Sequence, residues 1–260
     1  MTATSSISLR RRADRTAVVA SLAVTTAAAW ILTVQLAGGR TMPVESMDMA
    51  SAMPSAEPQL LFVAAMWAAM MIGMMVPSAT PMVLAYADWT RPEPTTDNRP
   101  GAVASFLSGY VVVWLGFSVL AAIVQVALER VDVLTAMGAI SRPAVAGTVL
   151  VLAGVFQVTP WKESCLRRCR TPVGFLIAEW RDGPRGAVVM GIRHGVYCLG
   201  CCWQLMAVLF VVGTMHLAWM AAVAGFVLVE KVAPRSLHIS HAAAAVLIGW
   251  GAWTLLSAAA

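Results

Sequence analysis

Charged residues are scarce in this chain of 260 residues: 12% are Asp, Glu, Lys or Arg, whereas 59% are hydrophobic. A soluble domain carries about a quarter charged residues, so the shortage excludes a water-soluble core of this size. The alternation of polar and apolar residues that a membrane β-barrel requires is also missing. Several apolar runs instead exceed the roughly 18 residues that a helix needs to cross a bilayer.

Sequence motifs of several enzyme and nucleic-acid-binding classes are absent as well. The chain has no nucleotide-binding loop, no nucleophile–base set and no metalloprotease helix. Its net charge is +5, and the sixteen Arg and two Lys lie mostly between apolar runs. We therefore expect a protein that is not an enzyme, that does not bind nucleic acid and that has the lipid bilayer as its main surroundings.

Seven apolar runs are expected to be membrane-spanning helices. They cover residues 17–37, 60–87, 103–128, 144–158, 190–212, 215–232 and 241–256. The sequence thus predicts an all-α, polytopic transmembrane bundle of about seven helices. Residues 17–257 would form a single membrane domain, and residues 1–16 a basic cytoplasmic N-terminus. A hairpin in the region of the fifth run, which would give six crossings, remains an alternative.

The polar segments between these runs differ in their content of basic residues. If the N-terminus is cytoplasmic, the inner segments hold 15 Lys and Arg and the outer segments hold 3. Cytoplasmic loops of membrane proteins carry the excess of Lys and Arg. We therefore expect the N-terminus inside and the C-terminus outside, in a bacterial inner membrane that the chain crosses several times.

All five cysteines fall within a short part of the chain. Cys165 and Cys169 form a C-x3-C pair in a basic inner segment, and Cys198, Cys201 and Cys202 form C-x2-C-C in the fifth predicted span. Spacings of three and four residues put side chains on one side of a helix. Because both groups lie on the predicted cytoplasmic side, we expect their thiols to converge.

Clustered thiols on the reducing side of a membrane favour a metal site over a structural disulfide. Thiolates are soft ligands suited to Cu(I) and to zinc, so copper as Cu(I) is the expected metal and zinc is the alternative. Two other interpretations stay open. The cysteines are small apolar packing residues, or Cys198 and Cys201 form the redox pair of a thiol–disulfide protein.

Other soft side chains accompany the cysteines. His194 precedes Cys198 by one helical turn and is either a ligand or an interfacial polar residue. Four methionines recur in the second predicted span: Met70, Met71, Met74 and Met75. Thioethers bind Cu(I) weakly enough to pass it on, although Met is also an ordinary packing residue.

Glu230 and Lys231, near the inner end of the sixth predicted span, are expected to pair and snorkel at the membrane surface.

Four segments of the chain resemble the bacterial DUF2182 family of predicted metal-binding integral membrane proteins. The segments are MWAAMMIGMMVPSATPM, FQVTPWKESCLRRCRTP, HGVYCLGCCWQLM and WMAAVAGFVLVEK, and together they span roughly Leu60 to Lys231. At least one relative is regarded as a copper chaperone that supplies a tyrosinase-type enzyme. The resemblance implies metal binding by Cys165, Cys169, Cys198, Cys201 and Cys202, with Lys162 and the Met-rich helix in support.

The sequence leaves the oligomeric state, the client protein and the direction of transfer open. Taken together, the patterns predict a membrane-embedded protein that binds a soft metal, copper by expectation, and inserts it into a partner cuproenzyme. A thiol–disulfide redox membrane protein and a non-catalytic scaffold subunit of a membrane assembly are the alternatives.

Overall fold

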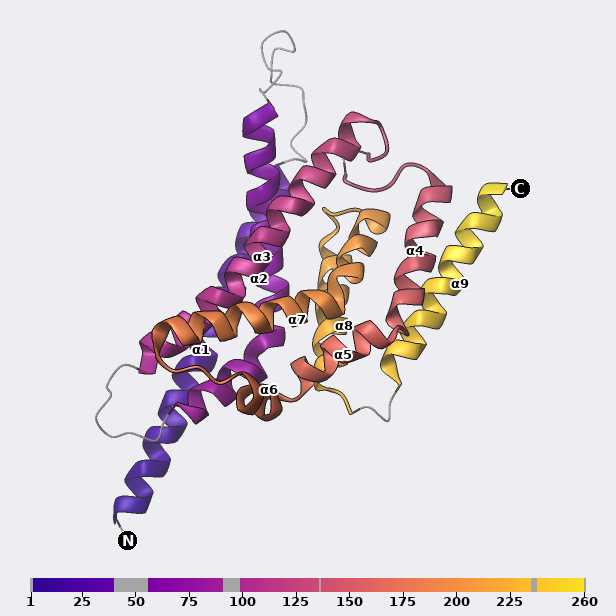
Figure 1. Cartoon of the computed structure of the whole chain (residues 1–260). Helices are drawn as coiled ribbons and strands as arrows, with labels where there is room; N and C mark the ends of the chain where they lie inside the picture. Colours follow the sequence, from indigo (N-terminus) through magenta and orange to yellow (C-terminus); the bar gives the residue numbers. More distant parts are fainter. Residues whose placement is uncertain (1, 40–55, 91–98, 136, 235–237, 260) are drawn as a thin grey trace.

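The computed structural model describes residues 2–39, 56–90, 99–135, 137–234 and 238–259. Every regular element in these ranges is a helix, and Figure 1 shows the helices gathered in one bundle. They are α1 (Thr2–Gly39), α2 (Ala56–Trp89), α3 (Arg99–Arg130), α4 (Pro143–Gln157), α5 (Pro160–Arg170), α6 (Pro172–Glu179), α7 (Gly183–Val212), α8 (Leu217–Val232) and α9 (Ile239–Ala259). The predicted all-α class is confirmed.

Helices occupy all seven of the predicted spans. Within the described ranges, five are long and apolar enough to cross a membrane, and they belong to α1, α2, α3, α7 and α9. A sixth candidate arises if α4 and α5, which are bent by 62° at a short break, count as one span. Because α4 has 15 residues and α8 has 16, neither reaches the roughly 18 residues of a full crossing by itself.

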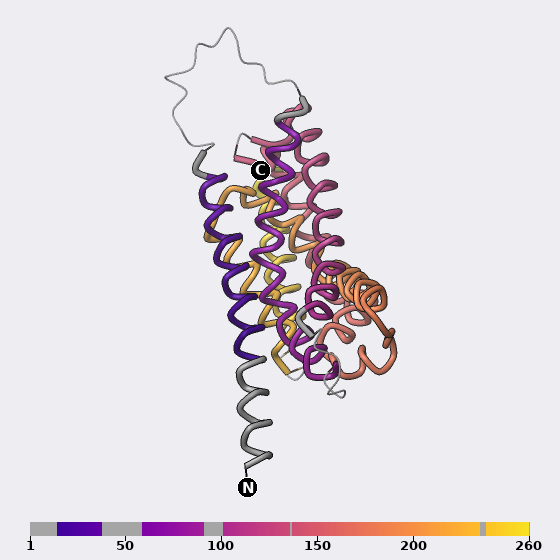
Figure 2. Tube along the Cα trace, turned by 90° about the vertical axis from the view of Figure 1, so that its left-hand side faces the viewer, coloured from indigo at the N-terminus to yellow at the C-terminus, as the bar shows by residue number. Residues whose placement is uncertain are grey.

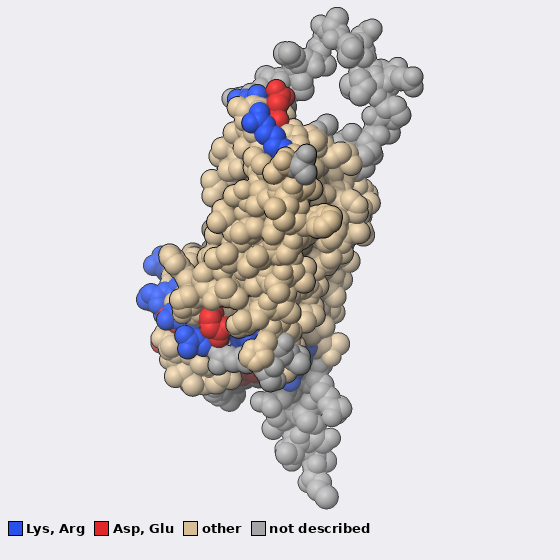
Figure 3. Space-filling model, turned by 90° about the vertical axis from the view of Figure 1, so that its right-hand side faces the viewer, with Lys and Arg blue, Asp and Glu red and all other residues tan. Residues whose placement is uncertain are grey.

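On one face of the bundle, the described residues form a belt without charges (Figure 3). Figure 3 shows Lys, Arg, Asp and Glu gathered at the two ends of one face, with other residues between them. Large apolar side chains such as Leu61, Leu152 and Trp253 are more than 60% exposed. An exposed apolar belt of this extent suits contact with lipid. The start of α1 and the end of α9 lie at opposite ends of the bundle (Figure 1), as the expected topology requires.

Helices α1, α2 and α3 lie side by side along the bundle (Figure 2). Helix α2 continues through Pro77 and Pro81 as far as Trp89. Its methionines point into the protein, because each of the following is at most 2% exposed: Met66, Met70, Met71, Met74, Met75 and Met82. The Met-rich face is therefore core, packed between neighbouring helices.

Helix α7 crosses α3 at close range. Figure 1 shows its first half running across the lower part of the bundle, and its largest packing partner is α3. Two glycines permit this contact. A Cβ on Gly191 would collide with the carbonyl oxygen of Phe106, and a Cβ on Gly109 would collide with that of Val188. Small residues allow two membrane helices to approach this closely, and here they bring the cysteines of α7 into the protein interior.

The basic segment after α4 folds into the short helices α5 and α6. Pro160 opens α5, and the hydroxyl oxygen of Thr159 accepts a hydrogen bond from the backbone N–H of Lys162 at 3.3 Å. Such a cap and an N-terminal proline favour a helix start. Pro172 opens α6 directly after the end of α5. Helix α5 packs on α7 and so carries its two cysteines to that helix.

We expect Gly191→Ala to weaken the bundle, because the added methyl group meets the backbone of α3. Overpacking of this kind lowers the free energy of unfolding by about 1–3 kcal/mol. The matched control is Gly116→Ala in α3, where a Cβ meets no atom within 4 Å. Thermal unfolding in detergent should show a lower midpoint for Gly191→Ala alone. Equal midpoints for the two variants would contradict the close crossing.

Candidate metal centre

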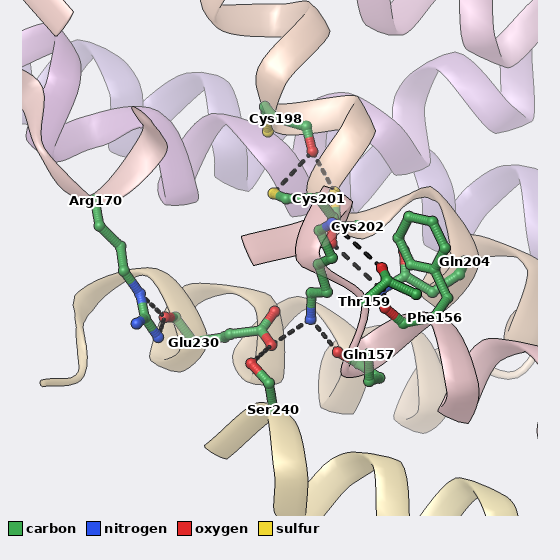
Figure 4. Close-up of polar contacts among 11 residues, drawn as sticks. Phe156, Gln157, Thr159, Arg170, Cys198, Cys201, Cys202, Gln204, Glu230 and Ser240 are labelled. Carbon is green, nitrogen blue, oxygen red and sulfur yellow. Dashed lines mark hydrogen bonds and ion pairs between the residues drawn. The ribbon is translucent and has the colours of Figure 1, made fainter. Parts of the chain in front are cut away.

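The two cysteine groups meet where α5 lies against α7. The thiol of Cys169 interacts with the thiols of Cys198 and Cys201. The thiols of Cys201 and Cys202 each donate to the backbone carbonyl of Cys198, at 3.1 and 2.9 Å, as Figure 4 shows. All five cysteines are free, and only Cys165 is partly exposed. The expected convergence is therefore seen in the structure, while the role of these thiols as ligands stays a prediction.

Cys165 stands at the edge of this group. It lies one turn before Cys169 on α5, and its thiol faces Gly200 of α7, where an added Cβ would be only 2.9 Å from Sγ. The missing side chain at Gly200 leaves room for this sulfur, which also interacts with Cys201. Cys165 thus links the buried thiols to the protein surface.

Polar side chains from three other helices surround Cys198. The Nζ of Lys231 in α8 donates to its sulfur at 2.9 Å and to Oγ of Ser78 in α2 at 2.8 Å. The hydroxyl of Tyr110 in α3 lies 3.2 Å from the same sulfur and donates to the carbonyl of Met75 at 3.0 Å. Cys198 is therefore the point where α2, α3, α7 and α8 meet.

The expectation that Glu230 and Lys231 pair with each other and snorkel at the membrane surface is wrong. Both side chains are buried, and each has a different partner. Snorkelling requires a charged end in water, but the side chains of Glu230 and Lys231 are 1% and 7% exposed and have buried partners. The sequence did contain a sign that Lys231 is buried, since it is one of two lysines in the chain and follows a long apolar run.

Glu230 belongs to a second buried polar group next to the thiols. Its carboxylate pairs with Nζ of Lys162, which also donates to the Oε1 of Gln157. Ser240 donates to the carboxylate at 2.6 Å, and Nε of Arg170 donates to the backbone carbonyl of Glu230 at 2.7 Å. Figure 4 shows this group joining α4, α5, α8 and α9. It therefore fixes α5, and with it Cys169, relative to α8.

The other predicted ligands lie close to this centre, though less directly. His194 is buried one turn before Cys198, with the rings of Phe106, Tyr110 and Phe175 between 5.6 and 6.1 Å from its own. Its Nδ1 has no hydrogen-bond partner within the described part of the chain, so a lone pair or N–H is free. Of the four methionines, Met75 adjoins the centre through its carbonyl, and Met70, Met71 and Met74 continue from it along α2 in the core.

The donor set suits Cu(I) better than zinc. In the described ranges, no group of three or more His, Cys, Asp or Glu side chains is arranged to hold a metal ion. Structural zinc usually takes four ligands in a tetrahedron, and nothing here supports it. Cu(I) is soft and accepts as few as two sulfur ligands, so the chemistry of clustered thiols fits it without a tetrahedral set.

The comparison with protein families agrees with this chemistry. The chain matches the family model PpoB2, described as a copper chaperone, over residues 63–254. The chain belongs to the PpoB2 copper chaperone family. No curated protein and no solved structure matches it significantly. The matched region includes α5, α7 and α8, so a copper-related function is shown for the part of the chain that carries all five cysteines.

Alkylation of the native protein should modify Cys165 first. The other four thiols are buried, and buried cysteines are inert to reagents that partly exposed ones meet. We expect them to react at least about tenfold more slowly. Mass spectrometry of maleimide-labelled protein over time would show one fast site, which Cys165→Ser removes and Cys202→Ser leaves unchanged. Fast labelling of several thiols would contradict the buried arrangement.

Proposed function

We propose that this protein is a membrane-embedded Cu(I) chaperone that delivers copper to a partner cuproenzyme. The observation that carries the proposal is the contact of Cys169 in α5 with Cys198 and Cys201 in α7. Thiols from two helices are free, buried and in contact, and thiolates are soft ligands that suit a soft ion. Membership of a copper chaperone family supplies independent support.

The thiols have different tasks in this proposal. Cys169 and a thiol of α7, Cys198 or Cys201, hold the ion, with Cys202 and His194 beside them. Cys165, the partly exposed thiol, exchanges the ion with a donor or acceptor at the protein surface. Exchange between thiolates requires no free ion, because the incoming sulfur binds before the outgoing sulfur leaves.

The methionines of α2 provide weaker positions for the same ion. Met75 adjoins the thiol centre, and Met74, Met71 and Met70 lead away from it inside the bundle. Neutral thioethers are soft and polarizable and release Cu(I) more readily than thiolates do. A path of this kind would carry copper from the cytoplasmic thiols towards the outer end.

The proposal also includes the location of the protein, its role and its client. The protein resides in the bacterial inner membrane as a multi-pass protein with residues 17–257 as its membrane domain. Its role is binding and transfer rather than catalysis. The resemblance to the DUF2182 family favours a tyrosinase-type cuproenzyme as the client.

The first test is the copper content of purified protein by mass spectrometry. Cys169→Ser and Cys198→Ser should each lose most of the bound copper, because the hydroxyl group is a hard ligand. The matched control is Ala187→Ser, which adds a hydroxyl at a buried position of the same helix three turns from Cys198. Copper that survives both cysteine substitutions would refute the proposed site.

The same preparation separates the alternatives. A redox protein would contain no metal and would show a reversible disulfide between Cys198 and Cys201. A scaffold subunit would show neither metal nor thiol chemistry and would co-purify with its assembly.

Transfer along α2 is tested with Met71→Leu and Met74→Leu. Leu has a similar volume and costs little packing energy, but it cannot bind copper. We expect both variants to retain copper and to pass it to the client severalfold more slowly, measured as the rate of client activation. The matched control is Met82→Leu, also buried in α2 but beyond Pro81. Equal rates in all variants would show that the methionines only pack.

A further inference from the structure

A polar cavity lies where α4 ends and where α5 and α9 begin. Its volume is about 370 Å³, which falls in the range of small-ligand pockets. The side chains that line it include Gln157, Arg170, His238 and His241, with Glu163 as the carboxylate. Among the described residues, no cysteine or methionine lines this cavity. It is therefore separate from the candidate metal centre.

Gln157 presents an unused hydrogen-bond donor at this cavity. The residue is 3% exposed, and its Oε1 accepts a hydrogen bond from Nζ of Lys162. Because an ammonium group can only donate, the amide oxygen has to face Lys162, and the free group of the amide is its NH2. Within the part of the chain that the structure describes, Nε2 has no hydrogen-bond partner. A buried donor without a partner is costly, so a ligand with an acceptor atom would satisfy it.

The first turns of two helices border the same cavity. Pro160 begins α5 and Ile239 begins α9, and both residues line it. The first backbone N–H groups of a helix have no partner within that helix, and the helix dipole places a partial positive charge there. Helix N-termini bind anions for these two reasons. Gln157 and both helix starts thus favour the same kind of ligand.

Most of the ionisable side chains at the cavity suit an anion as well. Arg170 uses Nε and Nη2 for the backbone carbonyl of Glu230, a residue whose carboxylate has its own ion pair. The other N–H groups of the guanidinium remain as donors. His238 and His241, whose ring centroids are 5.5 Å apart, add ring nitrogens at the start of α9. Glu163 repels an anion, but it is exposed, so water and salt weaken this repulsion.

We infer that this cavity binds a phosphate group. Donors border it from the end of α4, from the starts of α5 and α9, and from Arg170, so they suit a group with several oxygens in a tetrahedron. The phosphate belongs to a membrane phospholipid or is free inorganic phosphate. The position favours the lipid, because the cavity lies where the apolar helices α4 and α9 meet the polar end of the bundle. Basic pockets between membrane helices bind phospholipid headgroups in this way.

The inference is tested with two probes on the whole chain, purified in dodecyl maltoside and freed of lipid. Equilibrium dialysis measures the binding of radiolabelled inorganic phosphate. Native mass spectrometry measures the binding of dihexanoyl phosphatidylglycerol below its micelle concentration. Dihexanoylglycerol, which has the same acyl chains without the phosphate, is the matched control ligand.

Four variants separate the contributions of single side chains. Gln157→Glu keeps an acceptor for Lys162 and removes the NH2 group, whereas His241→Ala removes an exposed ring. Glu163→Gln removes the carboxylate that repels the ligand. The control is Arg167→Gln, since Arg167 is an exposed cation of α5 that does not line the cavity.

We expect Gln157→Glu to weaken binding of the phosphate-bearing probe by about tenfold or more, because a donor to an anion is replaced by a second anion. His241→Ala should weaken it severalfold, and Glu163→Gln should strengthen it severalfold, because a repulsion is lost. Arg167→Gln should bind as the wild type does. If Gln157→Glu fails to fold, the two exposed positions still give changes of opposite direction.

The two probes also distinguish the sources of the phosphate. Binding of the phospholipid but not of inorganic phosphate supports a headgroup site, and the reverse supports a site for free phosphate. The inference is overturned if neither probe binds, or if dihexanoylglycerol binds as tightly as the phospholipid. It is also overturned if Gln157→Glu, His241→Ala and Glu163→Gln all bind as the wild type does. None of these results depends on copper, so the proposed function is tested separately.

Discussion

Two buried lysines, each with its own compensating partner, determine how this bundle is assembled around its sulfur centre. Glu230 and Lys231 are neighbours at the end of α8, yet Glu230 pairs with Lys162 of α5, whereas Lys231 contacts Cys198 of α7. Removing either partner would leave an unpaired charge in an apolar interior, which costs several kcal/mol. The end of α8 is therefore held to α5 on one side and to α7 on the other. The contact between the two cysteine-bearing helices follows from this double attachment.

Close backbone packing complements the buried charges. The glycines at the crossing of α3 and α7 let α7 run across the bundle, so its cysteines face the interior from the side. Because Gly200 has no side chain, the sulfur of Cys165 can pack against α7 at this position. Small residues set the distances between helices, and buried polar groups set which side chains face each other. Both are needed for thiols from two separate helices to meet.

Much of this arrangement could be predicted from the sequence, because long apolar runs and cysteine spacing act locally. Apolar runs located the long helices, and spacings of three and four predicted that Cys198, Cys201 and Cys202 share one side of α7. The partners of Lys231 could not be predicted in this way. Whether a lysine at the end of an apolar run reaches water or turns inward depends on Ser78 and Tyr110, more than a hundred residues away in sequence. The same holds for Gly200, because the need for a residue without a side chain at this position is seen only when Cys165 of α5 packs against it.

A chaperone has to hold copper tightly enough to prevent loss and loosely enough to release it. In the proposed function the buried sulfur centre meets the first requirement, because Cys198 and Cys202 are both 0% exposed and water has no direct access to them. The second requirement falls to ligand exchange at Cys165, the thiol nearest the surface. In the proposed function, an ion that moves from the buried sulfurs to a mixed set with Cys165 would pass between similar ligands, so the free-energy difference of each step would be small. Tight binding and fast transfer are then compatible, because the ion is never without a sulfur ligand on its way out.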